Sequence, residues 1–158
     1  MTYAVVIITY LLICGVGIAA FLYRELLMRY FLPLTEYSVG AAERPDARTL
    51  LVELEPRGEP LAFALGQFVY VNFGSDKWRP HPFTVASGSS ARRLQLAIRA
   101  SGDETSRLYE VLQPGVTAVV AGPHGRFNYR RGGARQVWIA AGIGVTPFIS
   151  WIRSAGFR

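Results

Sequence analysis

The pattern of apolar and polar residues divides the chain into three parts. Residues 2–23 form a continuous apolar run without a charged side chain. Residues 36–121 contain short apolar or alternating runs separated by turn residues, which is typical of β-strands. Residues 136–140 are apolar and precede a glycine-rich turn and a helix start, as in a buried parallel strand.

The first part predicts a membrane helix, because about twenty apolar residues cross the hydrocarbon core of a bilayer. Tyr3 and Tyr23 stand at its two ends, where aromatic residues are enriched. Arg24 and Arg29 follow the run, whereas no lysine or arginine precedes it, so we expect the following domain on the cytoplasmic side. A signal peptide is the alternative, but the run is long and lacks a basic leader. We expect the helix to continue past the membrane and to end before Pro33.

The middle part predicts a small antiparallel Greek-key β-barrel over residues 33–131, because it contains six short strand patterns and one helix. A turn containing Pro45 and Asp46 separates the first two strands. The expected strands are 36–39, 49–54, 67–73, 81–87, 93–99 and 117–121, with a helix over 104–112. We assign residues 1–32 to the membrane helix and its cytoplasmic extension. Residues 134–158 begin an α/β nucleotide-binding domain, which we expect to be truncated because one strand and one helix cannot bury a core.

Composition narrows the possible partners. The net charge is +6 and 51% of the residues are hydrophobic, which is high for a soluble protein. The arginines are scattered through strand-like segments, which argues against a nucleic-acid-binding arm. Cys14 is the single cysteine, and His81 and His124 are the only histidines. The chain therefore lacks the residues for an internal disulfide, a cysteine metal cluster or a haem site that needs several histidines, and we predict no metal site.

The first candidate site is the run from Arg79 to Ser87, which contains two prolines. Proline fixes φ and removes backbone donors, so we expect a stiff, extended edge that presents His81, Phe83 and Thr84. A flat aromatic ring beside a hydroxyl suits a flat heterocycle, since the ring packs and the hydroxyl bonds a ring nitrogen. An ordinary edge strand that uses proline to prevent pairing is the alternative.

The second candidate site joins the end of a strand, at Arg99, to the start of a helix with Thr105 in its first turn. A helix N-terminus presents free N–H groups and the positive end of a dipole, so with a guanidinium and a hydroxyl it suits a pyrophosphate. Asp103 and Glu104 suit the helix dipole but repel phosphate. A helix that is merely capped by Ser101 or Asp103 is the alternative.

Two glycine-containing turns follow. Residues 122–127 predict a tight turn, in which we expect His124 to be exposed and inert. Gly142 and Gly144 permit close approach of the backbone to a pyrophosphate. Pro147 suits a first helical position, but it replaces the third glycine of the ordinary dinucleotide fingerprint. A bare strand-to-helix turn is the alternative.

Together these motifs resemble those of the ferric reductase and NADPH oxidase family, which carries a ferredoxin–NADP reductase-like dehydrogenase module. In family order they are His-Pro-Phe-Thr at 81–84, an arginine with Gly-x-x-Thr at 99–105, Gly-Pro-x-Gly-x-Phe at 122–127 and Gly-x-Gly-x-Thr-Pro at 142–147. The resemblance covers residues 37–158 and implies binding of FAD and NAD(P)H. The implied cofactor-binding residues are His81, Pro82, Phe83, Thr84, Ile98, Arg99, Gly102, Thr105, Ser106, Gly142, Gly144, Thr146 and Pro147.

The same resemblance implies hydride transfer from NAD(P)H to FAD, followed by transfer of single electrons to an acceptor. Phe83 and Thr84 are the implied catalytic residues, with the ring near the isoalloxazine and the hydroxyl near N5. His81 stands where soluble reductases use arginine, so we expect it at the ribityl or phosphate part.

The first helix resembles the last transmembrane helix of a ferric reductase-type membrane domain. We therefore expect part of a larger membrane-bound flavoprotein oxidoreductase, in contact with lipid and with haem-bearing helices outside this chain. The acceptor is then haem, ferric iron or oxygen. A membrane-anchored flavin reductase with a soluble protein acceptor, and a non-catalytic FAD- or partner-binding fragment, are the alternatives.

Overall fold

The computed structural model describes residues 2–23, 34–74, 79–89, 91–133 and 135–155. The chain forms two compact units, Met1–Pro33 and Leu34–Arg158. The expected helical extension over residues 24–31 and its end before Pro33 lie outside the described residues, as do residues 77–78 of a turn that the sequence predicts over residues 77–80.

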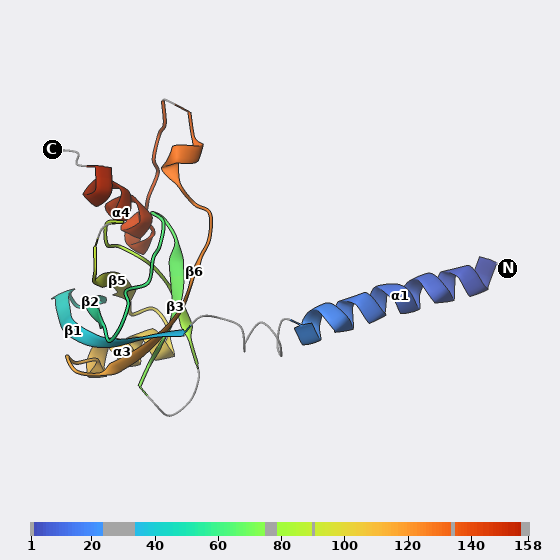
Figure 1. Ribbon diagram of the computed structural model, residues 1–158, viewed down its shortest axis with the longest axis horizontal. Coiled ribbons are helices and arrows are strands. Elements are labelled where there is room, and N and C mark those ends of the chain that lie inside the picture. Colours follow the sequence, from blue (N-terminus) through green and yellow to red (C-terminus); the bar gives the residue numbers. More distant parts are fainter. Residues whose placement is uncertain (1, 24–33, 75–78, 90, 134, 156–158) are drawn as a thin grey trace. The chain divides into compact units, whose positions relative to one another are not determined.

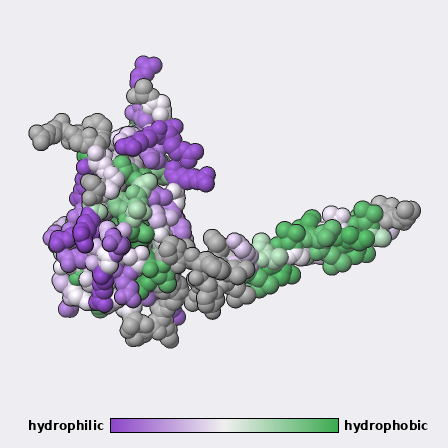
Figure 2. Space-filling model, in the orientation of Figure 1, coloured by the Kyte–Doolittle hydropathy of each residue, from purple (hydrophilic) through white to green (hydrophobic). Residues whose placement is uncertain are grey.

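The first unit contains the helix α1 (Thr2–Leu22), whose described side chains are apolar on all sides and largely exposed (Figure 2). Residues Tyr3–Leu22 are long and apolar enough to cross a membrane. Length and composition alone support this assignment, and a signal sequence near an N-terminus meets the same test.

The second unit contains a curled six-stranded antiparallel sheet in the order β4-β3-β6-β1-β2-β5 (Figure 1). Six short antiparallel strands were expected, and the structure confirms them. The strands are β1 (Leu34–Asp46), β2 (Thr49–Pro56), β3 (Phe68–Phe73), β4 (His81–Thr84), β5 (Leu94–Arg99) and β6 (Thr117–His124). The remaining described elements are the helix α3 (Asp103–Val111), the short 3-10 helices η2 (Tyr129–Arg131) and η3 (Gly142–Val145), and the helix α4 (Thr146–Ala155).

Alternation of side chains along the strands builds the core. On β5, Leu94, Leu96 and Ile98 are buried, whereas the residues between them are half-buried. Tyr37 is fully buried on β1, and its hydroxyl accepts a hydrogen bond of 2.8 Å from the main-chain N–H of Leu61. Burial raises the pKa of the Tyr37 phenol. The core therefore lies inside the curled sheet, and one buried polar group is satisfied by the adjoining loop.

The strands β4 and β5 stand at the two ends of the strand order. A single antiparallel bridge between Val85 and Leu96 connects these two edges. The bridge brings the His-Pro-Phe-Thr strand beside the strand that ends at Arg99, although they are the most distant strands within the sheet order. The open edge between β4 and β5 thus carries both of the candidate sites expected in the barrel.

The C-terminal part packs against the barrel without adding a strand. The prediction of a strand over residues 136–140 is wrong: the segment has no regular secondary structure, and Val137 and Ile139 are 88% and 86% exposed. A strand requires a hydrogen-bonded neighbour, and no strand pairs with this segment among the described residues. A buried cluster of Leu65, Phe148 and Trp151 instead fastens α4 to the loop before β3.

Two further expectations are corrected. The chain reverses between β1 and β2 at residues 47–48, so the turn is bounded by Asp46, as expected, whereas Pro45 lies in β1 outside it. The Asp46 carboxylate accepts hydrogen bonds of 2.8 Å from the N–H groups of Arg48 and Thr49, which fixes the turn there. His124 is half-buried, not exposed, because its ring packs against Phe68 and Tyr70 on β3.

Candidate functional site

The β4 strand pairs with β3 along its whole length, so its side chains alternate between the core and the outside. Phe83 is only 8% exposed and lies 6.3 Å from the ring of Phe73. Pro82 is exposed, and His81 and Thr84 are half-buried. The strand can therefore offer Pro82 and the Thr84 hydroxyl to a ligand, while Phe83 supports them from the core and shows only a small part of its ring.

The N-terminal end of β4 faces the C-terminal end of β5. Continuing the antiparallel register from the bridge at Val85 and Leu96 carries His81 toward the level of Arg99. The charges on α3 agree with this arrangement. The pKa of Glu104 is lowered, mainly by a hydrogen bond from Arg107 and also by the positive fields of His81 and Arg79. The charges at the start of β4 therefore act on the first turn of α3.

The first turn of α3 is built around Thr105. Its hydroxyl accepts hydrogen bonds of 3.1 Å from the N–H groups of Ser101 and Gly102, and it donates one of 3.1 Å to the Gly102 carbonyl. The alternative of a cap at Ser101 or Asp103 is wrong, since Gly102 is the N-cap and makes no side-chain bond. The Thr105 hydroxyl thus shapes the loop, and the main-chain N–H groups of the first turn remain the natural donors for an anion.

Arg99 ends β5 with an exposed side chain that makes no hydrogen bond or ion pair with any other described residue. Ile98, beside it, is 1% exposed, so it can meet a ligand only through its main chain. Ser106 is half-buried in the first turn of α3. Glu104, which was expected to repel phosphate, is paired with Arg107. This end of the barrel therefore combines an uncommitted guanidinium with a helix N-terminus at which one of the two first-turn carboxylates, Glu104, is compensated, whereas Asp103 is exposed.

The glycine-rich loop reaches the same place. Gly142 has φ +52°, a conformation that favours glycine, and a Cβ added there would lie 3.8 Å from Nη1 of Arg99. Gly144 has open space around it. Thr146 is buried and donates a hydrogen bond of 2.7 Å to the Ile143 carbonyl, which closes the turn into α4. Pro147 follows in the first turn of that helix, where no intrahelical N–H is required.

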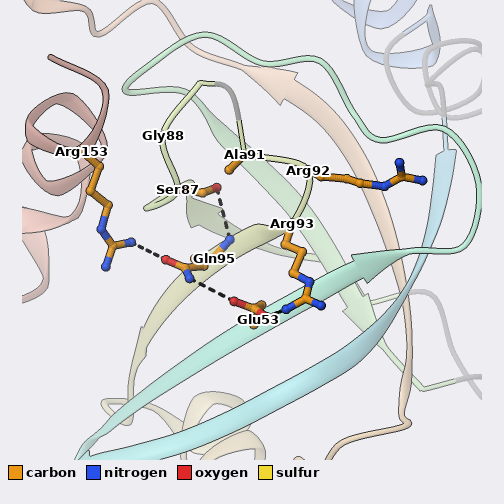
Figure 3. A pocket seen from close by; sticks show the side chains of 8 residues that line it. All are labelled: Glu53, Ser87, Gly88, Ala91, Arg92, Arg93, Gln95 and Arg153. Carbon is orange, nitrogen blue, oxygen red and sulfur yellow. Dashed lines mark hydrogen bonds and ion pairs between the residues drawn. The ribbon is translucent and has the colours of Figure 1, made fainter. Parts of the chain in front are cut away.

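A cleft of about 590 Å³ is lined by Arg153 of α4 and by residues of the barrel that include Ser87 and Gln95 (Figure 3). A chain of hydrogen bonds crosses it from Arg153 on α4 through Gln95 and Glu53 to Arg93. Hydrogen bonding by Gln95, followed by Arg93, lowers the pKa of Glu53. The buried Ser150 hydroxyl adds a hydrogen bond of 3.0 Å to the Ser87 carbonyl. Ser87, the last residue of the first candidate run, lines this cleft, but none of the implied cofactor-binding residues does. Its hydrogen bonds hold α4, and with it the glycine-rich loop, against the barrel.

Three of the four sequence motifs therefore meet at one end of the barrel, whereas the turn at 122–127 does not belong to the site and extends β6 to His124. Sequence reasoning assigned no role to Arg79, whose charge reaches the start of α3. Its position directly before the His-Pro-Phe-Thr motif was the available signal. Its main-chain N–H donates a hydrogen bond of 2.9 Å to the Asn72 side chain, which fixes the entry to β4.

Known proteins share both the sequence and the fold. Residues 34–129 match a family described as an FAD-binding domain. NADPH oxidase 1 of Rattus norvegicus is 32% identical over 118 residues, which are 68% of this chain and 20% of that protein. Ferredoxin–NADP reductase B of Sorangium cellulosum is 31% identical over 102 residues, or 62% of this chain and 42% of that protein. The chain thus spans a fifth to two fifths of these relatives.

The solved structure of a ferredoxin NADP+ reductase from Neisseria gonorrhoeae, with bound FAD and NADP, superimposes with a TM-score of 0.69. The superposition covers 78% of this chain and 52% of the reductase chain, and the two sequences are 21% identical. The fold is thus that of the flavin domain of ferredoxin–NADP reductases. The chain belongs to the FAD-binding domain family and resembles the dehydrogenase module of NADPH oxidases, which confirms the resemblance inferred from the sequence motifs.

Proposed function

We propose that residues 34–155 bind FAD along the open edge between β4 and β5 and pass electrons from NAD(P)H to a one-electron acceptor. The observation that supports this proposal is the meeting of β4, the start of α3 and the Gly142 loop at one end of the barrel. The matching family and the two named reductase and oxidase relatives support the same class of reaction.

The described residues fit FAD in two places. The Arg99 side chain has no hydrogen-bonding partner among the described residues, and the adjacent first turn of α3 has N–H groups that the helix itself does not use, so the two suit a pyrophosphate. Gly142 leaves room beside the guanidinium that a side chain would fill. On β4, the exposed ring of Pro82 and the Thr84 hydroxyl provide an apolar surface and a hydrogen-bonding group for a flat ring system.

Bound FAD supplies the redox chemistry, since a flavin takes up a hydride and releases electrons one at a time. The roles of the chain are to bind and to orient. Thr84 holds the ring at its hydrogen-bonding edge, with Phe83 packed behind the strand. Arg99, His81 and the start of α3, from Gly102 to Ser106, hold the phosphates. The loop from Gly142 to Pro147 presents backbone N–H groups to the pyrophosphate of NAD(P)H.

The membrane setting is part of the proposal. The helix α1 has the length and composition of a membrane span, and NADPH oxidases are among the relatives. We infer an integral membrane protein of the ferric reductase and NADPH oxidase type, with its FAD domain on the cytoplasmic side. Haem-bearing transmembrane helices outside this chain are then its electron-accepting partners, and ferric iron or oxygen is the terminal acceptor.

A flavin titration tests the central claim. The purified chain, in detergent, is titrated with FAD, FMN and riboflavin by isothermal titration calorimetry, and ADP is tested as a competitor of FAD. A separate pyrophosphate site predicts that FAD binds about tenfold or more tightly than FMN, because charge-assisted hydrogen bonds to the second phosphate are added. Competition by ADP is expected. Equal or tighter binding of FMN contradicts the proposed site.

A further inference from the structure

Residues 44–49 form the end of the β1–β2 hairpin. This hairpin end contacts the segment of residues 99–112 at both ends of that segment. One contact is at the C-terminus of α3 and the other is directly before the start of that helix. The hairpin end contains no residue of the proposed FAD site. Its contacts therefore concern the support of that site, not the ligand.

At the C-terminus of α3, Arg44 donates hydrogen bonds to main-chain carbonyls. Its Nε lies 2.6 Å from the carbonyl oxygen of Tyr109, and its Nη2 lies 3.0 Å from that of Leu112. The last carbonyls of a helix have no partners within the helix and carry the negative end of its dipole. No basic residue stands in the last turn of α3. Arg44, which is 65 positions before Tyr109 in the sequence, supplies the missing cation.

The Tyr109 side chain in turn contacts the hairpin end. Its ring lies under the Arg44 guanidinium, 5.5 Å from ring centroid to Cζ, and its hydroxyl donates a hydrogen bond of 2.8 Å to the Asp46 carbonyl. Near the other end, the N–H of Ala100 donates a hydrogen bond of 2.7 Å to the Arg48 carbonyl. The residue directly after Arg99 is therefore fixed by the same turn that binds the far end of α3.

We infer that Arg44 is a positioning residue for the phosphate half of the FAD site, acting through α3. The inference rests on the proposed function, because it requires that the start of α3 and Arg99 hold the phosphates. The helix has only nine residues, so a shift at its C-terminus is transmitted to its N-terminus about 13 Å away. Hydrogen bonds to a phosphate depend on distances of a few tenths of an ångström, so loosening this support weakens them.

Three variants test the inference in the detergent-purified full chain. Arg44→Ala removes the guanidinium, and Tyr109→Phe removes only the hydroxyl that bonds the Asp46 carbonyl. Arg48→Ala is the matched control, because this exposed arginine belongs to the same hairpin end and its side chain has no partner among the described residues. Binding of FAD and of riboflavin is measured for each variant and compared with Arg99→Ala, which tests the phosphate site directly.

We expect Arg44→Ala to weaken FAD binding about threefold to tenfold and to change riboflavin binding less than twofold, since riboflavin lacks phosphates. Tyr109→Phe should give a smaller effect in the same direction, and Arg48→Ala none. Equal loss for both ligands would show a merely structural role and overturn the inference, as would unchanged binding of FAD. If the wild type itself binds riboflavin as tightly as FAD, the proposed phosphate site fails, and the positioning role fails with it.

Discussion

Replacing Arg99 by alanine tests whether the arginine at the end of β5 binds a phosphate. In the ligand-free chain, its side chain is exposed and has no hydrogen-bonding partner among the described residues. Its field is only the weakest of the causes that lower the pKa of Asp46. The substitution therefore removes no hydrogen bond or ion pair between described residues, and we expect the free energy of unfolding to change by less than about 0.5 kcal/mol.

The substitution should instead lower the affinity for FAD. A hydrogen bond to a charged group contributes about 1.5–3 kcal/mol, which corresponds to roughly 10- to 150-fold in affinity. Because Arg99 is exposed, solvent screening favours the lower end of this range, so we expect FAD to bind about tenfold more weakly. Arg99→Lys should give an intermediate value, since it keeps the charge but loses the two-pronged geometry of the guanidinium.

Isothermal titration of FAD and riboflavin at two salt concentrations provides the measurement. Arg92→Ala is the matched control, because Arg92 is exposed, has no partner within the described part of the chain and points away from the cleft residues in Figure 3. FAD binding by the wild type should weaken with salt more steeply than binding by Arg99→Ala. If Arg99→Ala and Arg92→Ala bind FAD equally well, Arg99 is only a surface charge and the reasoning is refuted.

Two further predictions concern stability. Gly66→Ala should lower the free energy of unfolding by at least about 2 kcal/mol, because φ is +82° and the added Cβ would lie 1.9 Å from the Phe127 carbonyl oxygen. Its thermal unfolding is compared with that of Gly133→Ala, where the added Cβ has open space around it, and equal melting temperatures would contradict the prediction. The pKa of Glu53 is lowered in the folded chain, mainly by a hydrogen bond from Gln95. The ionised Glu53 carboxylate therefore stabilises the fold above the unfolded pKa near 4.3, and this contribution is lost as the pH falls through the folded pKa. As the pH falls below about 4, Glu53→Gln should therefore lose less stability than the wild type in denaturant titrations, and parallel losses would disprove this.

Local patterns in the sequence were sufficient for most of the barrel. Alternation along residues 94–99 predicts a strand with one buried face, because successive side chains of a strand point to opposite sides. Pro114 and Gly115 predict the end of α3 in the same local way, since proline and glycine interrupt helices. The candidate site residues could also be predicted from the sequence, because they stand in short motifs of neighbouring positions.

Contacts between distant segments were not available from local patterns. The bridge between Val85 and Leu96 brings β4 and β5 together, although these strands stand at opposite ends of the strand order. The apolar run at 136–140 predicts a strand, but pairing needs a neighbouring strand, which the described residues do not supply. The half-buried position of His124 depends in the same way on the β3 side chains that pack against it.

The sequence by itself thus determined the elements and the residues with suitable chemistry, because both depend on periodicity and on side-chain type over a few neighbouring positions. The tertiary structure alone decided which of these residues meet. Arg44 supports α3 from 65 positions away, and Gly142 lies beside Arg99 only because α4 is held against the barrel. Such contacts arise when the chain curls around a common core, and no local pattern in the sequence records them.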